Sequence, residues 1–383
     1  MSERDVWQDI KEYPKISIIN PIRNVERTIE KNLDTLLEID YPKERMEIIF
    51  ADGGSTDKSV EIIKSYQKTY SCIKLVVIPN CKSPGQARNA ALGVAEGEYI
   101  LFTDGDCAPL TDWAKKIIEP FLRDGAIGMV GGEILTLRTD PENVVETYCE
   151  ETGFLKVAGR CALYEAGYYP TIEKHLPHEV NGNIYSPFFA TANAAVSKKA
   201  VDTIGRRFWD EITSEDVDFS LRILKAGFKL YFQPSAIVNH MHRVTLDAYR
   251  RQLYGYGFGH PLAVLKHAKK VLEVRPQYFG YFSIPIPFPI KGIIYIGDFH
   301  FMHLFGLGFL LSLLFGWTAS TSLIMMLGFA FFTWKYFKPM RRLRPQNKFL
   351  TWCKIRYLSN WSLMLGGFKG AKTFGVVYVE SSW

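Results

Sequence analysis

The sequence predicts an α/β fold in which a mainly parallel sheet carries helices on both faces, followed by a helical C-terminal part. Short apolar runs alternate with helical stretches between residues 15 and 135, and this alternation is typical of a parallel sheet. Residues 299–337 are almost free of charge. The composition, 47% hydrophobic and 22% charged, is that of a globular chain and excludes a disordered one.

The alternation starts with the strand Ile16–Ile19 and the helix Glu26–Ile39. Apolar residues recur in that helix at Ile29, Leu33 and Leu36, which is a helical spacing. Further strands are predicted at 47–51, 75–78 and 99–103, with helices at 60–66 and 86–96. Ligands of such sheets bind beyond the carboxyl ends of the strands, so the residues after each strand are candidates for a site.

The pattern is looser from residue 136 onwards. We predict a strand near Phe188–Val196 and a helix at Asp216–Ala226, with Gly227 suited to its C-terminal cap. Two further strands are predicted, at Lys229–Phe232 and Ala236–Val238. No internal repeat or low-complexity tract interrupts this region.

The uncharged segment Phe299–Phe337 predicts a membrane hairpin, because one span needs only about 20 apolar residues. The expected spans are Met302–Trp317 and Ser320–Tyr336, and the alternative is a buried hairpin of a soluble protein. Lys335, Lys338, Arg341, Arg342, Arg344 and Lys348 follow and are expected to face the cytoplasm. Residues 349–368 mix cationic and apolar side chains, which predicts an interfacial helix.

Two further observations predict a cytoplasmic catalytic body. The N-terminal residues 1–15 lack an apolar core, so no signal peptide is expected. The six cysteines form no CxxC pair and are expected to be reduced thiols. The predicted location is therefore the cell membrane, with more than one span and the catalytic body on the cytoplasmic face.

Several protein classes are excluded by what the sequence lacks. The first strand ends at Asn20-Pro21 without a glycine, and no GxxxxGK[ST] segment is present, which argues against dinucleotide-binding and P-loop proteins. The formal charge of +6 over 383 residues is too mild for a nucleic-acid binder.

Asp104-Gly105-Asp106 follows the strand at 99–103 directly. Two carboxylates separated by a flexible glycine can reach one divalent cation, and Mg²⁺ or Mn²⁺ binds through such carboxylates together with substrate phosphates. A cation there would stabilise a departing diphosphate. The alternative for the triplet alone is a solvated turn.

Other charged residues are expected at the same edge of the sheet. Asp52 ends the second strand, where it could bind a nucleoside or form an Asx turn beside Gly53. Arg88 lies in the first turns of a helix and brings a permanent charge to this edge. Glu215 and Asp216 begin a helix, where they could cap it or take a proton from an acceptor hydroxyl.

Taken together, these motifs resemble family 2 glycosyltransferases. The resemblance covers roughly residues 15–243 and rests on motifs in the family's order, which are Asn20-Pro21, 52-DGGSTD-57, 85-GQARN-89, Asp104-Gly105-Asp106, Asn193, 215-EDVD-218 and the segment from Pro234 to His240. It implies a GT-A fold, a nucleoside-diphosphate sugar donor and inversion at the anomeric carbon.

The resemblance also implies roles for individual residues. Asp216, with Glu215 beside it, would be the general base, while Asp104, Asp106 and His240 would hold a divalent cation, Mn²⁺ or Mg²⁺. The residues expected to contact the nucleotide sugar are Pro21, Asp52, Arg88, Asp104, Asn193 and Arg251.

The resemblance, together with the composition of the C-terminal part, divides the chain into regions of expected function. The donor-binding half is 15–135 and the acceptor-binding and catalytic half 136–245, followed by an amphipathic interfacial region (246–298), the hairpin (299–337) and a basic tail (338–383). A lipid-linked or glycan acceptor and membrane lipids are the expected partners, and nucleic acid is not. Processive members of the family carry a QxxRW motif. Here Gln252 is present but the Arg-Trp pair is not, which argues against a polymer-extruding synthase. The alternatives are a sugar-nucleotide nucleotidyltransferase and a non-catalytic membrane scaffold.

Overall fold

A computed structural model of the chain describes residues 7, 10, 12–161, 163–169, 187–268, 270–277, 282–284 and 291–380. The chain separates into two compact units. The first contains residues 1–139 and 155–241, and the second contains 140–154 and 242–383. Most of the N-terminal segment 1–11 and of the stretch 278–290 in the predicted interfacial region lies outside the described residues. The proposed functional boundary at residue 135 stays a prediction.

The first unit begins with four parallel strands, as the alternation predicts. They are ordered β3-β2-β1-β4 in the sheet, and all three pairings between them are parallel. The strands are β1 (Ile16–Ile22), β2 (Met46–Asp52), β3 (Ile73–Val77) and β4 (Tyr99–Phe102), and the helices between them are α1 (Ile29–Leu37), α2 (Ser59–Gln67) and α3 (Pro84–Val94).

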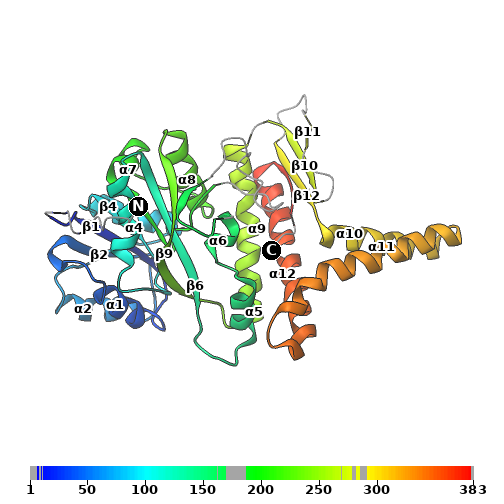
Figure 1. Cartoon of the computed structure of the whole chain (residues 1–383), viewed down its shortest axis with the longest axis horizontal. Coiled ribbons are helices and arrows are strands. Elements are labelled where there is room, and N and C mark those ends of the chain that lie inside the picture. The colour runs from blue at the N-terminus through cyan, green and yellow to red at the C-terminus, as the bar shows by residue number, and fades with distance from the viewer. Residues whose placement is uncertain are drawn as a thin grey trace, which may run out of the picture. The chain divides into compact units, whose positions relative to one another are not determined.

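The other half of this sheet is mixed, so the prediction of a mainly parallel sheet was wrong. β8 runs antiparallel to β4 and β6, while β9 runs parallel to β6 and antiparallel to β5 and β7. Its strands are β5 (Cys107–Pro109), β6 (Ile127–Leu137), β7 (Gly167–Tyr169), β8 (Ala194–Ser197) and β9 (Lys229–Met241), and its helices are α4 (Trp113–Arg123), α6 (Val157–Cys161), α7 (Lys198–Thr203) and α8 (Glu215–Lys225). Figure 1 shows α1 and α2 on one side of the sheet and α7 and α8 on the other.

β9 is one long strand where the sequence predicted two short ones. Pro234 has no N–H for a ladder, and the pairing with β6 shifts at this point, from Gly132–Gln233 to Glu133–Ile237. This irregularity absorbs the proline as a bulge does, so the strand continues to Met241. The continuation matters because it carries His240 to the edge of the sheet where β4 ends.

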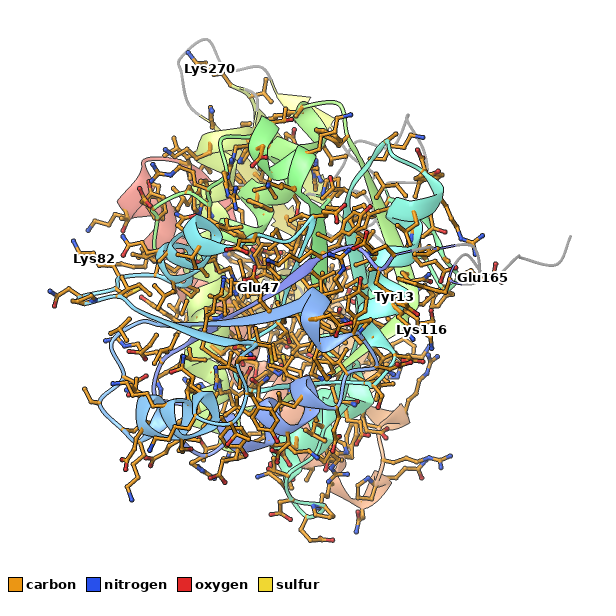
Figure 2. The ribbon with its side chains drawn as sticks, turned by 90° about the vertical axis from the view of Figure 1, so that its left-hand side faces the viewer. Tyr13, Glu47, Lys82, Lys116, Glu165 and Lys270 are labelled. Atoms are coloured by element: carbon orange, nitrogen blue, oxygen red, sulfur yellow. The ribbon has the colours of Figure 1, made fainter. Side chains whose placement is uncertain are left out.

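A buried carboxylate ties the parallel strands together. Glu47 on β2 is 4% exposed; it accepts hydrogen bonds from the Ser17 hydroxyl and the Glu96 N–H, and it pairs with the Lys74 ammonium at 2.6 Å. Burial alone would raise the pKa of Glu47, but the Glu96 N–H and Lys74 lower it below its ordinary value. Figure 2 shows Glu47 among packed side chains and Lys82 at the periphery.

The second unit is built around two long helices that approach each other closely. A Cβ atom added to Gly257 of α9 would lie 2.0 Å from the Leu363 carbonyl oxygen, and one on Gly366 of α12 would lie 2.1 Å from that of Tyr254. The elements of this unit are α5 (Val144–Thr152), α9 (Leu246–His267), β10 (Leu272–Pro276), β11 (Phe282–Ile284), β12 (Gly292–Ile296), α10 (Asp298–Leu314), α11 (Ala319–Phe337) and α12 (Phe349–Phe374), with β13 (Val377–Val379). Trp352 and Ile355, part of the predicted interfacial helix, are buried within the unit.

The predicted hairpin forms as α10 and α11, but the prediction that it crosses a membrane was wrong. Among the described residues, no helix combines the length and the apolar character that a membrane span requires. α10 has 17 residues and is therefore about 26 Å long, against a hydrocarbon core of about 30 Å. α11 has Ser and Thr residues in its first turn and Lys335 in its last turn, which reduces its mean hydropathy. The predicted multi-pass membrane location is thereby overturned.

Candidate active site

The loop after β4 carries the two predicted acidic residues, and a buried amide holds it in place. The Nδ2 atom of Asn32 on α1 donates to the carbonyl oxygens of Asp104 at 3.1 Å and Cys107 at 2.7 Å. The Asn32 Oδ1 accepts from Asn20 Nδ2 at 2.7 Å. Asn32 was not among the predicted site residues, although a polar residue between Ile29 and Leu33 on the apolar face of a helix is a usable signal.

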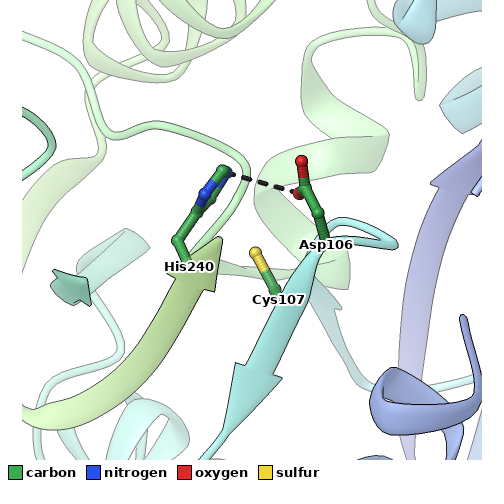
Figure 3. Close-up of side chains that lie close together, drawn as sticks. All are labelled: Asp106, Cys107 and His240. Atoms are coloured by element: carbon green, nitrogen blue, oxygen red, sulfur yellow. Dashed lines mark ion pairs between the residues drawn. The ribbon is translucent and has the colours of Figure 1, made fainter. Parts of the chain in front are cut away.

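The Asp106 carboxylate faces the ring of His240, which reaches it from the end of β9. Asp106 Oδ1 lies 3.4 Å from His240 Nε2, as Figure 3 shows. The Nδ1 atom of His240 lies 2.6 Å from the Met241 carbonyl oxygen. A carbonyl oxygen can only accept, so Nδ1 carries a proton, and Nε2 is the ring nitrogen that faces Asp106 and could bind a metal. The structure therefore brings Asp106 and His240 together from 134 positions apart in the sequence.

Arg88 joins two of the predicted acidic residues, Asp104 and Glu215, into one cluster. Its Nη1 atom lies 2.8 Å from Glu215 Oε1 and its Nη2 atom 2.9 Å from Asp104 Oδ1. The Arg88 side chain is 4% exposed, that of Glu215 13% and that of Asp104 29%. Burial, together with repulsion from Asp106, raises the pKa of Asp104 above its ordinary value although Arg88 opposes the shift. The Asp104 carboxylate thus forms an ion pair with Arg88 and also lies close enough to Asp106 to be affected by its charge.

Asp216 lies beside this cluster in the first turn of α8 and is only partly buried. Its Oδ1 atom accepts the Val217 N–H at 2.8 Å, whereas Glu215 next to it is bound to Arg88. Ser214 before them has a φ of 58°, a left-handed conformation that is strained for a residue with a side chain. The turn therefore separates the two neighbouring carboxylates into different environments.

Asp52 ends β2 and forms the predicted Asx turn. Its carboxylate accepts the N–H groups of Gly54 at 3.2 Å and Ser55 at 3.1 Å, and the residue is 1% exposed. Pro21 lies opposite Ala51 in the register of β1 and β2, beyond the last pair of β1 with β4. Contacts of these residues with a nucleoside stay a prediction.

Two further residues, Arg251 and Asn193, were predicted to contact the donor. Arg251 is exposed on α9 in the second unit, and its phosphate contact stays a prediction. Asn193 is 1% exposed, and its amide is engaged within the core. Its Nδ2 donates to the carbonyl oxygens of Glu133 at 2.8 Å and Ala236 at 2.9 Å, while its Oδ1 accepts from Trp113 Nε1 at 2.8 Å. These bonds link β6, β9 and α4 beneath the site.

Replacing Asn193 with alanine is expected to lower the free energy of unfolding by about 3 kcal/mol, because each buried group left without a partner costs about 1–3 kcal/mol. Urea unfolding measures this effect. Asn347→Ala, at an exposed position, is the matched control and should change stability by less than about 0.5 kcal/mol. A large loss of donor affinity in Asn193→Ala with unchanged stability would instead favour a direct donor contact.

Comparisons with known proteins agree with this architecture. Two family models match, "Glycosyl transferase family 2" over residues 17–152 and "Glycosyl transferase family group 2" over residues 168–337. The chain is 28% identical over 286 residues to dolichyl N-acetyl-alpha-D-glucosaminyl phosphate 3-beta-D-2,3-diacetamido-2,3-dideoxy-beta-D-glucuronosyltransferase of Methanococcus voltae, covering 73% of this chain and 82% of the relative. It is 23% identical over 239 residues to glycosyltransferase AglE of Haloferax volcanii, covering 62% and 71%.

The fold has a counterpart among solved structures. Mannosyltransferase PcManGT from Pyrobaculum calidifontis, solved with GDP-Man and Mn²⁺, aligns with a TM-score of 0.55 at 17% identity, over 94% of this chain and 88% of that one. At this identity the alignment shows the fold alone, which is a GT-A-like α/β fold with a mixed sheet and C-terminal helices.

The fold and the family matches define a nucleotide-sugar-dependent glycosyltransferase. The nucleotidyltransferase and scaffold alternatives find no counterpart in these matches. The chain belongs to glycosyltransferase family 2.

Proposed function

We propose that the enzyme transfers a sugar, with inversion, from a nucleoside-diphosphate sugar to a hydroxyl group of a lipid-linked saccharide. The observation that carries the proposal is the single cluster at the end of β4. In it Asp106 faces His240 Nε2 at 3.4 Å, and Asp104 shares Arg88 with Glu215. Carboxylates gathered at strand ends with an imidazole are suited to a site that receives a diphosphate together with a cation.

Asp106 and His240 fit a divalent cation such as Mn²⁺ or Mg²⁺. A carboxylate oxygen is a suitable ligand, and so is an imidazole nitrogen when the other nitrogen of the ring is hydrogen-bonded to a carbonyl oxygen. Asp104, whose carboxylate is already held by Arg88, would contact either the ribose or the cation. When bound, the cation would stabilise the negative charge that develops on the diphosphate leaving group.

The protein groups would perform the remaining steps. Asp216 takes the proton of the acceptor hydroxyl, whose oxygen attacks the anomeric carbon from the face opposite the diphosphate. The bond between that carbon and the diphosphate oxygen breaks as the new glycosidic bond forms, and the nucleoside diphosphate leaves. Asp52 would contact the nucleoside, and Arg251 would contact a phosphate.

The acceptor class is suggested by the Methanococcus relative, whose name describes transfer to a dolichyl-phosphate-linked N-acetylglucosamine. That relative matches this chain over 82% of its own length. We therefore expect a saccharide carried on a lipid phosphate, either polyprenyl-linked or as a glycolipid, rather than a free sugar.

Nucleotide sugars are expected to stabilise the protein only when a divalent cation is present. At a ligand concentration of 100 times Kd the gain in unfolding free energy is about 2.7 kcal/mol. Thermal unfolding with UDP- and GDP-sugars, with Mn²⁺ and then with excess EDTA, measures it. Asp106→Asn and His240→Ala should lose the gain that depends on Mn²⁺, whereas Asp247→Asn, an exposed acid on α9, should keep it. If no nucleotide sugar stabilises the Mn²⁺-treated protein, the proposal fails.

A further inference from the structure

A third potential metal ligand lies between Asp106 and His240. Cys107 begins β5 and is the register partner of His240 in the antiparallel pair β5–β9. Directly opposed residues of such a pair present their side chains on the same face. One ligand atom each from Asp106, Cys107 and His240 lies within 4.8 Å of the others. Figure 3 shows the sulfur pointing into the space between the carboxylate and the ring.

The main chain that carries this sulfur is hydrogen-bonded on both sides. The Cys107 N–H donates to the Asp104 carbonyl at 3.0 Å, and the Cys107 carbonyl accepts from Asn32 Nδ2 at 2.7 Å. The Met241 N–H donates to the Asp106 carbonyl at 3.0 Å, which fastens the His240 end of β9 to the same loop. The backbone of the three residues is therefore held together by bonds that involve none of their ligand atoms.

The surroundings of the thiol distinguish it from an ordinary buried cysteine. Cys107 is 1% exposed, and its Sγ lies 3.9 Å from the Ala192 carbonyl oxygen, which is a long and weak hydrogen bond. A buried cysteine usually behaves as a small hydrophobic residue, but this one has a carboxylate and an imidazole nitrogen as close neighbours. Carboxylate, imidazole and sulfur converging on one point form a set of ligands for a cation softer than Mg²⁺.

We propose that Cys107 Sγ is a third protein ligand at the cation site of Asp106 and His240, and that the site consequently binds thiophilic cations such as Co²⁺, Zn²⁺ and Cd²⁺ in addition to Mn²⁺. The inference rests on the proposed function for the position of that site. As the sulfur–metal bond forms, the thiol proton passes to solvent. Mn²⁺ has little preference for sulfur, so a thiophilic cation competes with it through a bond that Mn²⁺ hardly uses.

Cobalt spectroscopy on the full chain tests the bond directly. Co²⁺ is expected to give a sulfur-to-cobalt charge-transfer band in the near ultraviolet, which Cys107→Ser removes. Cys353→Ser is the matched control, because Cys353 is also a free cysteine but belongs to α12 of the second unit, and it should keep the band. In competition with Mn²⁺ followed by electron paramagnetic resonance, Cys107→Ser should weaken Cd²⁺ binding by about tenfold or more and Mn²⁺ binding by less than about threefold.

The outcomes separate this inference from the proposed function. A Co²⁺-bound wild-type protein without the charge-transfer band would overturn the role of Cys107, whether or not the serine variant folds. Mn²⁺-dependent stabilisation by a nucleotide sugar would in that case leave the proposed function standing. If neither Co²⁺ nor Mn²⁺ binds in the presence of a nucleotide sugar, both are overturned.

Discussion

Replacing Arg88 with methionine is expected to lower the free energy of unfolding by about 3 kcal/mol, at the lower end of the cost of breaking a buried ion pair. The guanidinium bridges Glu215 and Asp104 at 2.8 and 2.9 Å, so its removal leaves two carboxylates facing each other without a cation. The lower end is appropriate because Asp104 is 29% exposed and can regain water. Transfer should be lost as well, since both carboxylates belong to the site.

The two effects of this substitution can be separated. Arg88→Lys keeps the charge but cannot donate to both carboxylates with one planar group, and it should fall between wild type and Arg88→Met in urea unfolding. Adding Asp104→Asn and Glu215→Gln to Arg88→Met removes the repulsion and should recover most of the stability without recovering transfer. A loss of less than about 1 kcal/mol in Arg88→Met would show that the bridge contributes little, as surface pairs do.

Replacing Asp216 with asparagine is expected to lower kcat by about 10²–10⁴-fold, which is the usual contribution of a general base. Asparagine keeps the size of the side chain and an oxygen that can accept the Val217 N–H, so α8 and the donor Kd should change little. Single-turnover transfer assays give kcat, and equilibrium binding of the nucleotide sugar gives Kd.

A matched control for Asp216 is available in the preceding loop. Asp210 is exposed and paired with Arg207, so Asp210→Asn removes the same charge from the same neighbourhood and should leave turnover near that of the wild type. Near-normal turnover in Asp216→Asn would contradict the assignment of Asp216 as the general base. Equal losses in both variants would point to the local charge rather than to proton transfer.

The sequence predicted best what depends on neighbouring residues. The elements between β1 and β4 follow from local apolar patterns, because α1 buries a periodic apolar face while β1 and β2 are short apolar runs buried on both faces. β9 was predicted as two strands because Pro234 interrupts a single-strand pattern. The irregularity that lets β9 continue past this proline lies in its pairing with β6, which is about a hundred residues earlier in the chain. The hairpin was predicted to span a membrane from its lack of charge, whereas the lengths and polar ends of α10 and α11 decide otherwise.

The site was predictable in its parts but not in its connections. Asp106 and His240 were expected to share a cation only through the family resemblance. The bond from Arg88 to Glu215 spans 127 positions, and no local pattern indicates it. Arg88 was expected to contact the nucleotide sugar, yet its two terminal nitrogens are bound to protein carboxylates. Cys107 was counted among the reduced thiols and not as part of the site, since its register with His240 appears only when β5 and β9 are paired.

The glycines between α9 and α12 limit how this part of the chain can vary. At Gly257 and Gly366 the facing backbone occupies the place of a side chain, so even a methyl group would force the helices apart or distort them. At these two positions the chain therefore tolerates only glycine, even though the facing residues Leu363 and Tyr254 carry side chains. Helices in such close contact also bring Cα–H groups within reach of carbonyl oxygens on the opposite helix, a weak attraction that larger residues would forfeit.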